Sequence, residues 1–79
     1  MFYVYVLFSK NYNRNYIGMS IDVEKRLNQH NLKQNRSTKA YVPWEIIYIE
    51  GFKTRVEARK REKYLKSGIG REFIKSLLN

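Results

Sequence analysis

The stretch that decides the fold is FYVYVLF (residues 2–8), which the polar, Asn-rich residues 10–15 separate from YIGM (residues 16–19). Both apolar runs are rich in aromatic and β-branched residues, which predicts two strands, and the segment between them predicts a turn. The two strands therefore form a hairpin. Because side chains alternate across a strand, one face of the first strand is expected to carry Phe2, Val4, Val6 and Phe8, and the other Tyr3, Tyr5 and Leu7.

Three helices and a third strand complete the predicted fold. Asp22 is suited to cap the first helix, and Thr54, with Glu57 three residues later, matches a capping box for the second. Gly68 is suited to end that second helix. The predicted ranges are 23–30, 54–66 and 71–78 for the helices, 44–52 for the strand and 31–43 for a long surface loop. The element order is β-β-α-β-α-α, which predicts one α+β domain (residues 1–79) with helices flanking a small three-stranded sheet.

The first predicted helix turns two polar side chains towards the domain interior. At about 100° per residue, Val23, Arg26, Leu27 and His30 fall within one arc of about 100°. A cationic side chain on an inward face needs a partner. Arg26 and His30 are therefore candidate functional residues.

The charge of the chain is the first indication of function. Sixteen Lys and Arg against seven Asp and Glu give a net charge of +9, which favours a polyanionic partner such as nucleic acid. A membrane surface fits less well, because the basic stretch lacks a broad apolar face, and a role in solubility alone is the remaining alternative. The residues predicted to contact phosphates are Lys33, Arg36, Lys39, Lys53, Arg59, Lys60 and Lys63.

The composition excludes several other classes of protein. The chain has no Cys, which excludes a disulfide scaffold, a thiolate metal site and a cysteine nucleophile. A single His and scattered carboxylates cannot assemble a zinc site, and neither a P-loop nor a G-x-S-x-G motif occurs. The apolar N-terminal run is shorter than the roughly 20 residues that span a bilayer and lacks the basic flank of a signal peptide. We expect a soluble, cytoplasmic protein.

Five features in order resemble the GIY-YIG nuclease family, and within it the small stand-alone bacterial members and the N-terminal nuclease domain of the DNA-repair excinuclease. The features are Tyr3-Val4-Tyr5 followed after ten residues by Tyr16-Ile17-Gly18, IDVEKRLNQH (residues 21–30), Ser37-Thr38-Lys39, PWEIIY (residues 43–48) and ARKRE (residues 58–62). The first tripeptide departs from Gly-Ile-Tyr but keeps its tyrosine.

The resemblance implies roles for five residues. Tyr5 would be the general base or the hydroxyl that orients the attacking water, and Tyr16 would contact the scissile phosphate. Arg26 would neutralise charge in the transition state with His30 assisting nearby, and Glu62 would bind one Mg²⁺ or Mn²⁺ ion. The implied reaction is cleavage of DNA (branched, flapped or single-stranded) to 5′-phosphate and 3′-hydroxyl ends, with room for a protein partner that supplies specificity. A tyrosine base needs a lowered pKa, and we expect the positive charge of Arg26 to lower that of Tyr5.

Plainer interpretations stand beside these roles. Tyr5 in a strand could serve packing alone, Arg26 could form a structural ion pair, and Glu62 could be the surface i,i+4 partner of Lys66. At the level of the whole chain, the alternative is a non-catalytic nucleic-acid binding module, which explains the charge and the aromatic residues equally well. A small assembly protein would instead expose an apolar patch on the last helix.

Overall fold

The predicted hairpin is present in the computed structural model, which describes residues 1–78. β1 (Phe2–Ser9) pairs antiparallel with β2 (Arg14–Ser20) on one side and with β3 (Glu45–Phe52) on the other, so the strand order is β2-β1-β3. The register places Tyr5 directly opposite Gly18 of β2. β1 is thus the central strand, and β2 is an edge strand. Asn79, the last residue of the predicted domain, lies outside the described residues.

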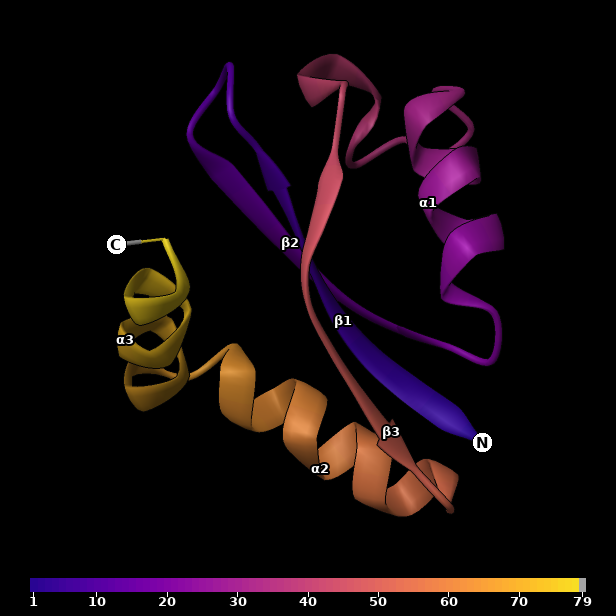
Figure 1. Ribbon diagram of the computed structural model, residues 1–79, viewed down its shortest axis with the longest axis vertical. Helices are drawn as coiled ribbons and strands as arrows, with labels where there is room; N and C mark the ends of the chain where they lie inside the picture. The colour runs from indigo at the N-terminus through magenta and orange to yellow at the C-terminus, as the bar shows by residue number, and fades with distance from the viewer. Residues whose placement is uncertain (79) are drawn as a thin grey trace.

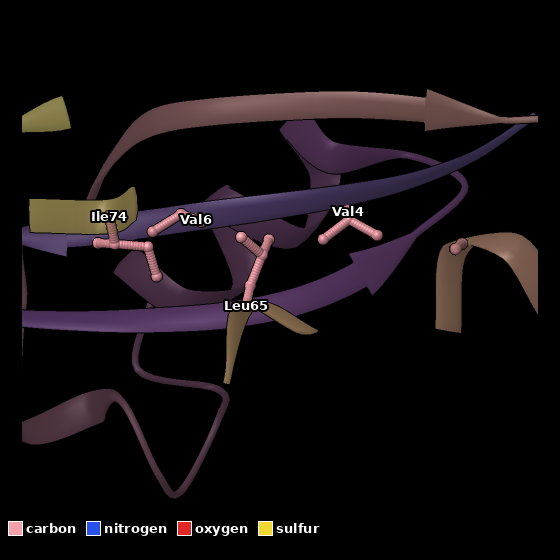
Figure 2. Close-up of a cluster of buried hydrophobic side chains, with 5 residues drawn as sticks. Val4, Val6, Leu65 and Ile74 are labelled. Atoms are coloured by element: carbon pink, nitrogen blue, oxygen red, sulfur yellow. The ribbon is translucent and has the colours of Figure 1, made fainter. Parts of the chain in front are cut away.

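The helices cover opposite faces of this sheet (Figure 1), which confirms the predicted α+β class. α2 (Arg55–Leu65) and α3 (Gly68–Leu77) lie on one face and α1 (Val23–Asn31) on the other. The alternation of β1 agrees with the prediction. Val4 and Val6 pack with residues of α2 and α3 in one apolar cluster (Figure 2), whereas Tyr5 and Leu7 pack with Val23 of α1 and with Trp44 in a second cluster.

Both predicted helix caps are present. The Asp22 carboxylate accepts a hydrogen bond from the backbone N–H of Lys25 at 3.1 Å, and the Thr54 hydroxyl accepts one from the N–H of Glu57 at 3.2 Å. Each cap satisfies a backbone donor that the first turn of a helix leaves free. These caps place the start of α1 and α2 within one residue of the prediction.

The prediction that Gly68 ends a helix is wrong, because Gly68 is the first residue of α3. The hydroxyl of Ser67 accepts a hydrogen bond from the N–H of Gly70 at 3.3 Å, so Ser67 caps α3, which begins three residues before the predicted start. Gly70 lies directly against the backbone of Leu65, where a Cβ atom would overlap the Leu65 backbone. This close approach lets α3 turn sharply after α2 and bury Ile74.

The predicted surface loop 31–43 is present after α1 with most of its residues exposed, but it is anchored to the rest of the domain. It includes a short 3-10 turn (Lys39–Tyr41), and Thr38 is fully buried. The Asn31 side chain bonds both backbone groups of Trp44, accepting from its N–H at 2.6 Å and donating to its carbonyl at 3.1 Å. The indole N–H of Trp44 donates in turn to the carbonyl of Thr38 at 3.0 Å. Side-chain hydrogen bonds, which leave no periodic pattern in the sequence, hold this segment against the sheet. Within residues 1–78, no helix has the length and apolar character needed to cross a membrane.

Candidate active site

The Tyr5 side chain extends from β1 and lies over Gly18 of the neighbouring strand β2. Tyr5 is 1% exposed, and a Cβ atom at position 18 would lie 2.7 Å from Cε2 of Tyr5 and overlap the hydroxyl end of its ring. Glycine is therefore required opposite Tyr5. Gly18, the last residue of Tyr16-Ile17-Gly18, makes space for Tyr5, the last residue of Tyr3-Val4-Tyr5. This contact gives a structural reason for the two tripeptides to occur together.

Replacing Gly18 with alanine is expected to lower the free energy of unfolding by about 1–3 kcal/mol, the usual cost of overpacking. The enclosed Tyr5 ring has little room to move away from the added methyl group. Urea unfolding followed by circular dichroism measures this loss. The matched control is Gly68→Ala, because nothing lies within 4 Å of a Cβ atom there and alanine favours a helix by up to about 1 kcal/mol. Equal losses in the two variants would contradict the packing explanation.

His30 connects Tyr5 to the buried Thr38. The Tyr5 hydroxyl oxygen lies 3.3 Å from Nε2 of His30, and Nδ1 of His30 lies 2.7 Å from the Thr38 hydroxyl oxygen. Burial, followed by the positive charge of Arg26, lowers the pKa of His30. The imidazole is therefore neutral near pH 7, so one ring nitrogen donates a hydrogen bond and the other accepts one.

Arg26 places its guanidinium beside the Tyr5 hydroxyl without a carboxylate partner. Its Nη1 donates to Oε1 of Gln29 at 3.0 Å, and Arg26 also lowers the pKa of Tyr5 as a hydrogen-bonding cation. Among residues 1–78, no ion pair involves Arg26. The structure therefore does not support the interpretation of Arg26 as a structural ion-pair residue, and its charge is available to an anionic substrate.

Arg26 lowers the pKa of Tyr5, as expected, but does not bring it below its ordinary value. Burial raises the pKa of Tyr5 above its ordinary value, and the hydrogen bond from Arg26 only partly offsets this effect. The charges of Tyr16 and Glu62 raise the pKa of Tyr5 further. Tyr5 is therefore a neutral phenol at neutral pH, suited to orienting a water molecule by hydrogen bonding.

Glu62 lies on the other face of the sheet, and its charge reaches the same hydroxyl. Its side chain is 13% exposed, and its carboxylate oxygens lie 3.2 Å from Nζ of Lys66 and 3.8 Å from Nη1 of Arg59. The predicted ion pair with Lys66 is thus present. The carboxylate also acts on Tyr5, whose pKa it raises. α1 and α2 lie on opposite faces, and the end of α2 reaches the edge strand β2, where Leu65 and Lys66 lie beside Tyr16.

Tyr16 lies where this edge meets solvent. Its ring centroid is 6.5 Å from that of Tyr5 and 4.9 Å from that of His30. Tyr16 is half-buried and helps line a surface hollow that also contains Lys66 and Arg71. Neither of these cations was among the predicted phosphate contacts, although both belong to the basic C-terminal stretch of the sequence. Their place beside Tyr16 makes the hollow suitable for a phosphate group.

The predicted phosphate-contacting residues form two groups. Lys33, Arg36 and Lys39 are exposed on the segment that follows α1. A second hollow, between α2 and the edge strand β2, is lined by Arg59, Lys60 and Lys63 together with Met19, Val56 and the unpredicted Arg55. Lys53 is exposed in the turn between β3 and α2. Cations therefore lie on both sides of the edge where the candidate catalytic groups meet.

The donor set of this site suits a metal ion that the substrate helps to hold. Among residues 1–78, no three His, Cys, Asp or Glu side chains are grouped as metal ligands. Glu62 offers one carboxylate, and its partners Arg59 and Lys66 have side chains that are 62% and 54% exposed and can therefore move away. Mg²⁺ typically binds one or two carboxylates, with water and substrate phosphates as its other ligands. A single Glu62 is compatible with that pattern.

Comparison with known proteins agrees with this fold. Residues 1–72 match the GIY-YIG catalytic domain. The chain is 38% identical over 66 residues to the UPF0213 protein SSP2268 of Staphylococcus saprophyticus, a match that covers 82% of this chain and 79% of that protein. It is 38% identical over 52 residues to the UPF0213 protein SAG0778 of Streptococcus agalactiae, which covers 65% of this chain but only 59% of the relative.

A solved structure has the same fold. The solution NMR structure of the UPF0213 protein BH0048 from Bacillus halodurans aligns with a TM-score of 0.57 and 28% identity, covering 98% of this chain and 85% of that one. The family match includes the hairpin, α1 and the whole of α2, and so every candidate catalytic residue. This chain belongs to the GIY-YIG family, in the branch of small UPF0213 proteins, and its matched catalytic domain indicates a nuclease.

Proposed function

We propose that this protein is a divalent-metal-dependent nuclease that hydrolyses phosphodiester bonds in DNA and leaves 5′-phosphate and 3′-hydroxyl ends. The observation that carries the proposal is the environment of the Tyr5 hydroxyl. His30 hydrogen-bonds to this hydroxyl, the unpaired cation Arg26 lies beside it, and the charge of Glu62 reaches it from the opposite face of the sheet. Packing alone does not require three ionisable side chains from α1 and α2 around one phenol.

We assign to Arg26 the role of stabilising negative charge on the phosphate. Hydrolysis builds negative charge on the phosphate oxygens, and a fixed cation in a partly buried site stabilises that charge strongly. The guanidinium is held by Gln29 and has no carboxylate partner among the described residues. It can therefore serve the substrate without first breaking an ion pair.

We assign Tyr5 to orienting the attacking water and Tyr16 to binding a phosphate oxygen. Tyr5 is neutral, since burial raises its pKa, and its oxygen can accept a hydrogen bond from the attacking water and so orient it. Tyr16 is half-buried beside a basic hollow, where its hydroxyl can donate to a phosphate oxygen. Glu62 would hold the Mg²⁺ or Mn²⁺ ion, which when bound stabilises the leaving oxygen as a Lewis acid.

A non-catalytic nucleic-acid binding module is the alternative that the charge alone would permit. Cations on both sides of the β2 edge serve binding and catalysis equally. A binding module has no use for an enclosed Tyr5 held by His30, or for a mostly buried Glu62, whose negative charge repels nucleic acid. On α3, Ile74 is buried and Phe73 packs on the core, while Ile69 at the start of the helix is exposed, so the apolar patch that the assembly interpretation requires is small.

A cleavage panel tests the proposal. Flapped, branched, single-stranded and duplex DNA, with RNA counterparts, are incubated with the purified protein in Mg²⁺ or Mn²⁺, and binding is measured in parallel. We expect cutting of at least one DNA class. Binding without cutting across the whole panel, at high protein concentration and with both ions, would favour the binding module. If cutting is slow but selective for one structure, a protein partner that supplies specificity is the next component to seek.

Binding is expected to weaken steeply with salt. Each phosphate contact contributes about 0.7 to 0.9 to the slope of log affinity against log salt concentration. Replacing Lys60 and Lys63 with glutamine should therefore lower the slope by about 1.5, as measured by fluorescence anisotropy. The control is the matched pair Lys10→Gln and Lys75→Gln, which lie outside the predicted contacts. Equal slopes for wild type and both double variants would show that the α2 surface is not the binding face.

A further inference from the structure

Thr38 occupies a position that no surface role explains. It is fully buried, although it lies in a polar, basic segment between exposed neighbours. Its hydroxyl oxygen is 2.7 Å from Nδ1 of His30 and 3.5 Å from the carbonyl oxygen of Asn35. Its own carbonyl accepts the indole N–H of Trp44 at 3.0 Å. Thr38 is thus fixed on its backbone side and presents its hydroxyl to His30.

The donors and acceptors of Tyr5, His30 and Thr38 favour one arrangement of their hydrogen atoms. Arg26, whose charge acts on the Tyr5 hydroxyl, carries only donors and offers the Tyr5 O–H no acceptor. The Tyr5 O–H then needs an acceptor elsewhere, and among the described residues Nε2 of His30 is the one in reach. If Nε2 accepts, Nδ1 carries the hydrogen of the neutral ring and donates to Thr38. The Thr38 hydroxyl donates in turn to the carbonyl of Asn35.

The opposite arrangement leaves a donor unsatisfied. If Nε2 carried the hydrogen, the Tyr5 oxygen would receive a hydrogen bond from His30. Its own O–H would then point at no acceptor in the described part of the chain, on a residue that is 1% exposed. A buried unsatisfied donor is uncommon and costly. The first arrangement satisfies every donor from Tyr5 to Asn35.

We infer that Thr38 is a positioning residue of the proposed nuclease, which fixes His30 in its Nδ1–H tautomer so that Nε2 takes the Tyr5 O–H. With that hydrogen directed to His30, the oxygen lone pairs of Tyr5 are left for Arg26 and for the attacking water. Thr38 touches no substrate and acts only through His30. The positioning role of Thr38 in catalysis rests on the proposed function, whereas the Nδ1–H tautomer of His30 does not. It also explains why Asn31 and Trp44 secure the segment 31–43 so firmly.

The tautomer can be measured directly, because His30 is the only histidine in the chain. Long-range ¹H–¹⁵N correlation NMR on ¹⁵N-labelled wild type near pH 7 distinguishes a protonated from an unprotonated ring nitrogen. We expect Nδ1 to be protonated and Nε2 unprotonated. A protonated Nε2 with an unprotonated Nδ1 would overturn the inference, whether or not the protein cuts DNA. This measurement requires no variant and is unaffected by any loss of folding.

The rate effect is tested with Thr38→Val, which keeps the shape of the side chain and removes the hydroxyl, and with Thr38→Ser, which keeps the hydroxyl. On flapped DNA with Mg²⁺ under single-turnover conditions, we expect Thr38→Val to cut about 10- to 100-fold more slowly, the scale of a misplaced catalytic group. Its DNA affinity should be unchanged and its His30 tautomer altered, and Thr38→Ser should restore both rate and tautomer.

A folded Thr38→Val with wild-type rate and tautomer would overturn the inference and leave the nuclease proposal intact. Absence of cutting by wild type, with the expected tautomer present, would overturn the proposed function and the rate effect but not the hydrogen-bond assignment.

Discussion

Glu62→Ala is expected to lower the cutting rate by about a hundredfold or more, the scale seen when one electrostatic stabiliser is removed, while affinity for DNA stays equal or rises slightly. The carboxylate is the residue assigned to hold the divalent ion, so its loss removes stabilisation of the leaving oxygen. It is also a negative charge that repels the substrate and that Lys66 and Arg59 now neutralise. Its removal frees both cations for phosphate contacts.

Two further variants separate this role from a structural one. Glu62→Gln keeps the shape of the mostly buried side chain and removes its charge, so it should lose as much activity as Glu62→Ala. Glu72→Ala removes the same charge from an exposed position on α3 and should cut at the wild-type rate. Circular dichroism checks the fold of each variant. If folded Glu62→Ala kept full metal-dependent activity, the glutamate would be no more than the surface partner of Lys66.

Arg26→Ala is expected to abolish cutting to a similar degree, about a hundredfold or more, but with a modest loss of DNA affinity. The guanidinium stabilises charge that grows as the phosphate reacts, so its removal affects the transition state more than the bound substrate. Single-turnover rates and anisotropy titrations measure the two effects separately. Arg26→Lys keeps the charge but loses the planar fork of donors, and we expect it to recover only part of the rate.

The position of Arg26 can also be tested without measuring DNA cutting, through the pKa of His30. The positive charge of Arg26 lowers the pKa of His30, because it disfavours the imidazolium form. Removing that charge in Arg26→Ala should therefore raise the pKa of His30 towards its ordinary value, as followed by NMR titration. Lys25→Ala removes the same charge from an exposed neighbour on α1 and should leave both the His30 titration and the cutting rate nearly unchanged. An unchanged titration in Arg26→Ala would show that its guanidinium lies away from this site.

The sequence predicted those parts of the fold that are encoded by local patterns. Alternation along residues 2–8 predicted both faces of β1, and the Asp22 and Thr54 caps predicted where two helices begin. Gly68 was misread because glycine often ends a helix, whereas Ser67 here starts the next one. That cap lacks the glutamate three residues later that made Thr54 easy to identify, and Gly70 stands there instead to permit close packing.

The site was harder to predict, because its energetics depend on burial. The positive charge of Arg26 near Tyr5 could be anticipated from the resemblance and does lower the pKa of that phenol, but burial of the ring outweighs it. Thr38 lies in a segment without periodicity, and only the folded chain shows its hydroxyl against His30. Likewise, Lys66 and Arg71 become candidate phosphate contacts only once Tyr16 is found beside them.

The central claim is that the groups around Tyr5 cut DNA, and one measurement tests it most directly. Wild type and Glu62→Gln, purified in parallel, are incubated with end-labelled flapped DNA in Mg²⁺ and in EDTA, and the product ends are identified by phosphatase treatment and ligation. We predict cutting by wild type in Mg²⁺ alone, with 5′-phosphate and 3′-hydroxyl ends, and no cutting by Glu62→Gln. Equal cutting by the two preparations, or firm binding by wild type with no cutting on this or any other substrate of the panel, would contradict the claim.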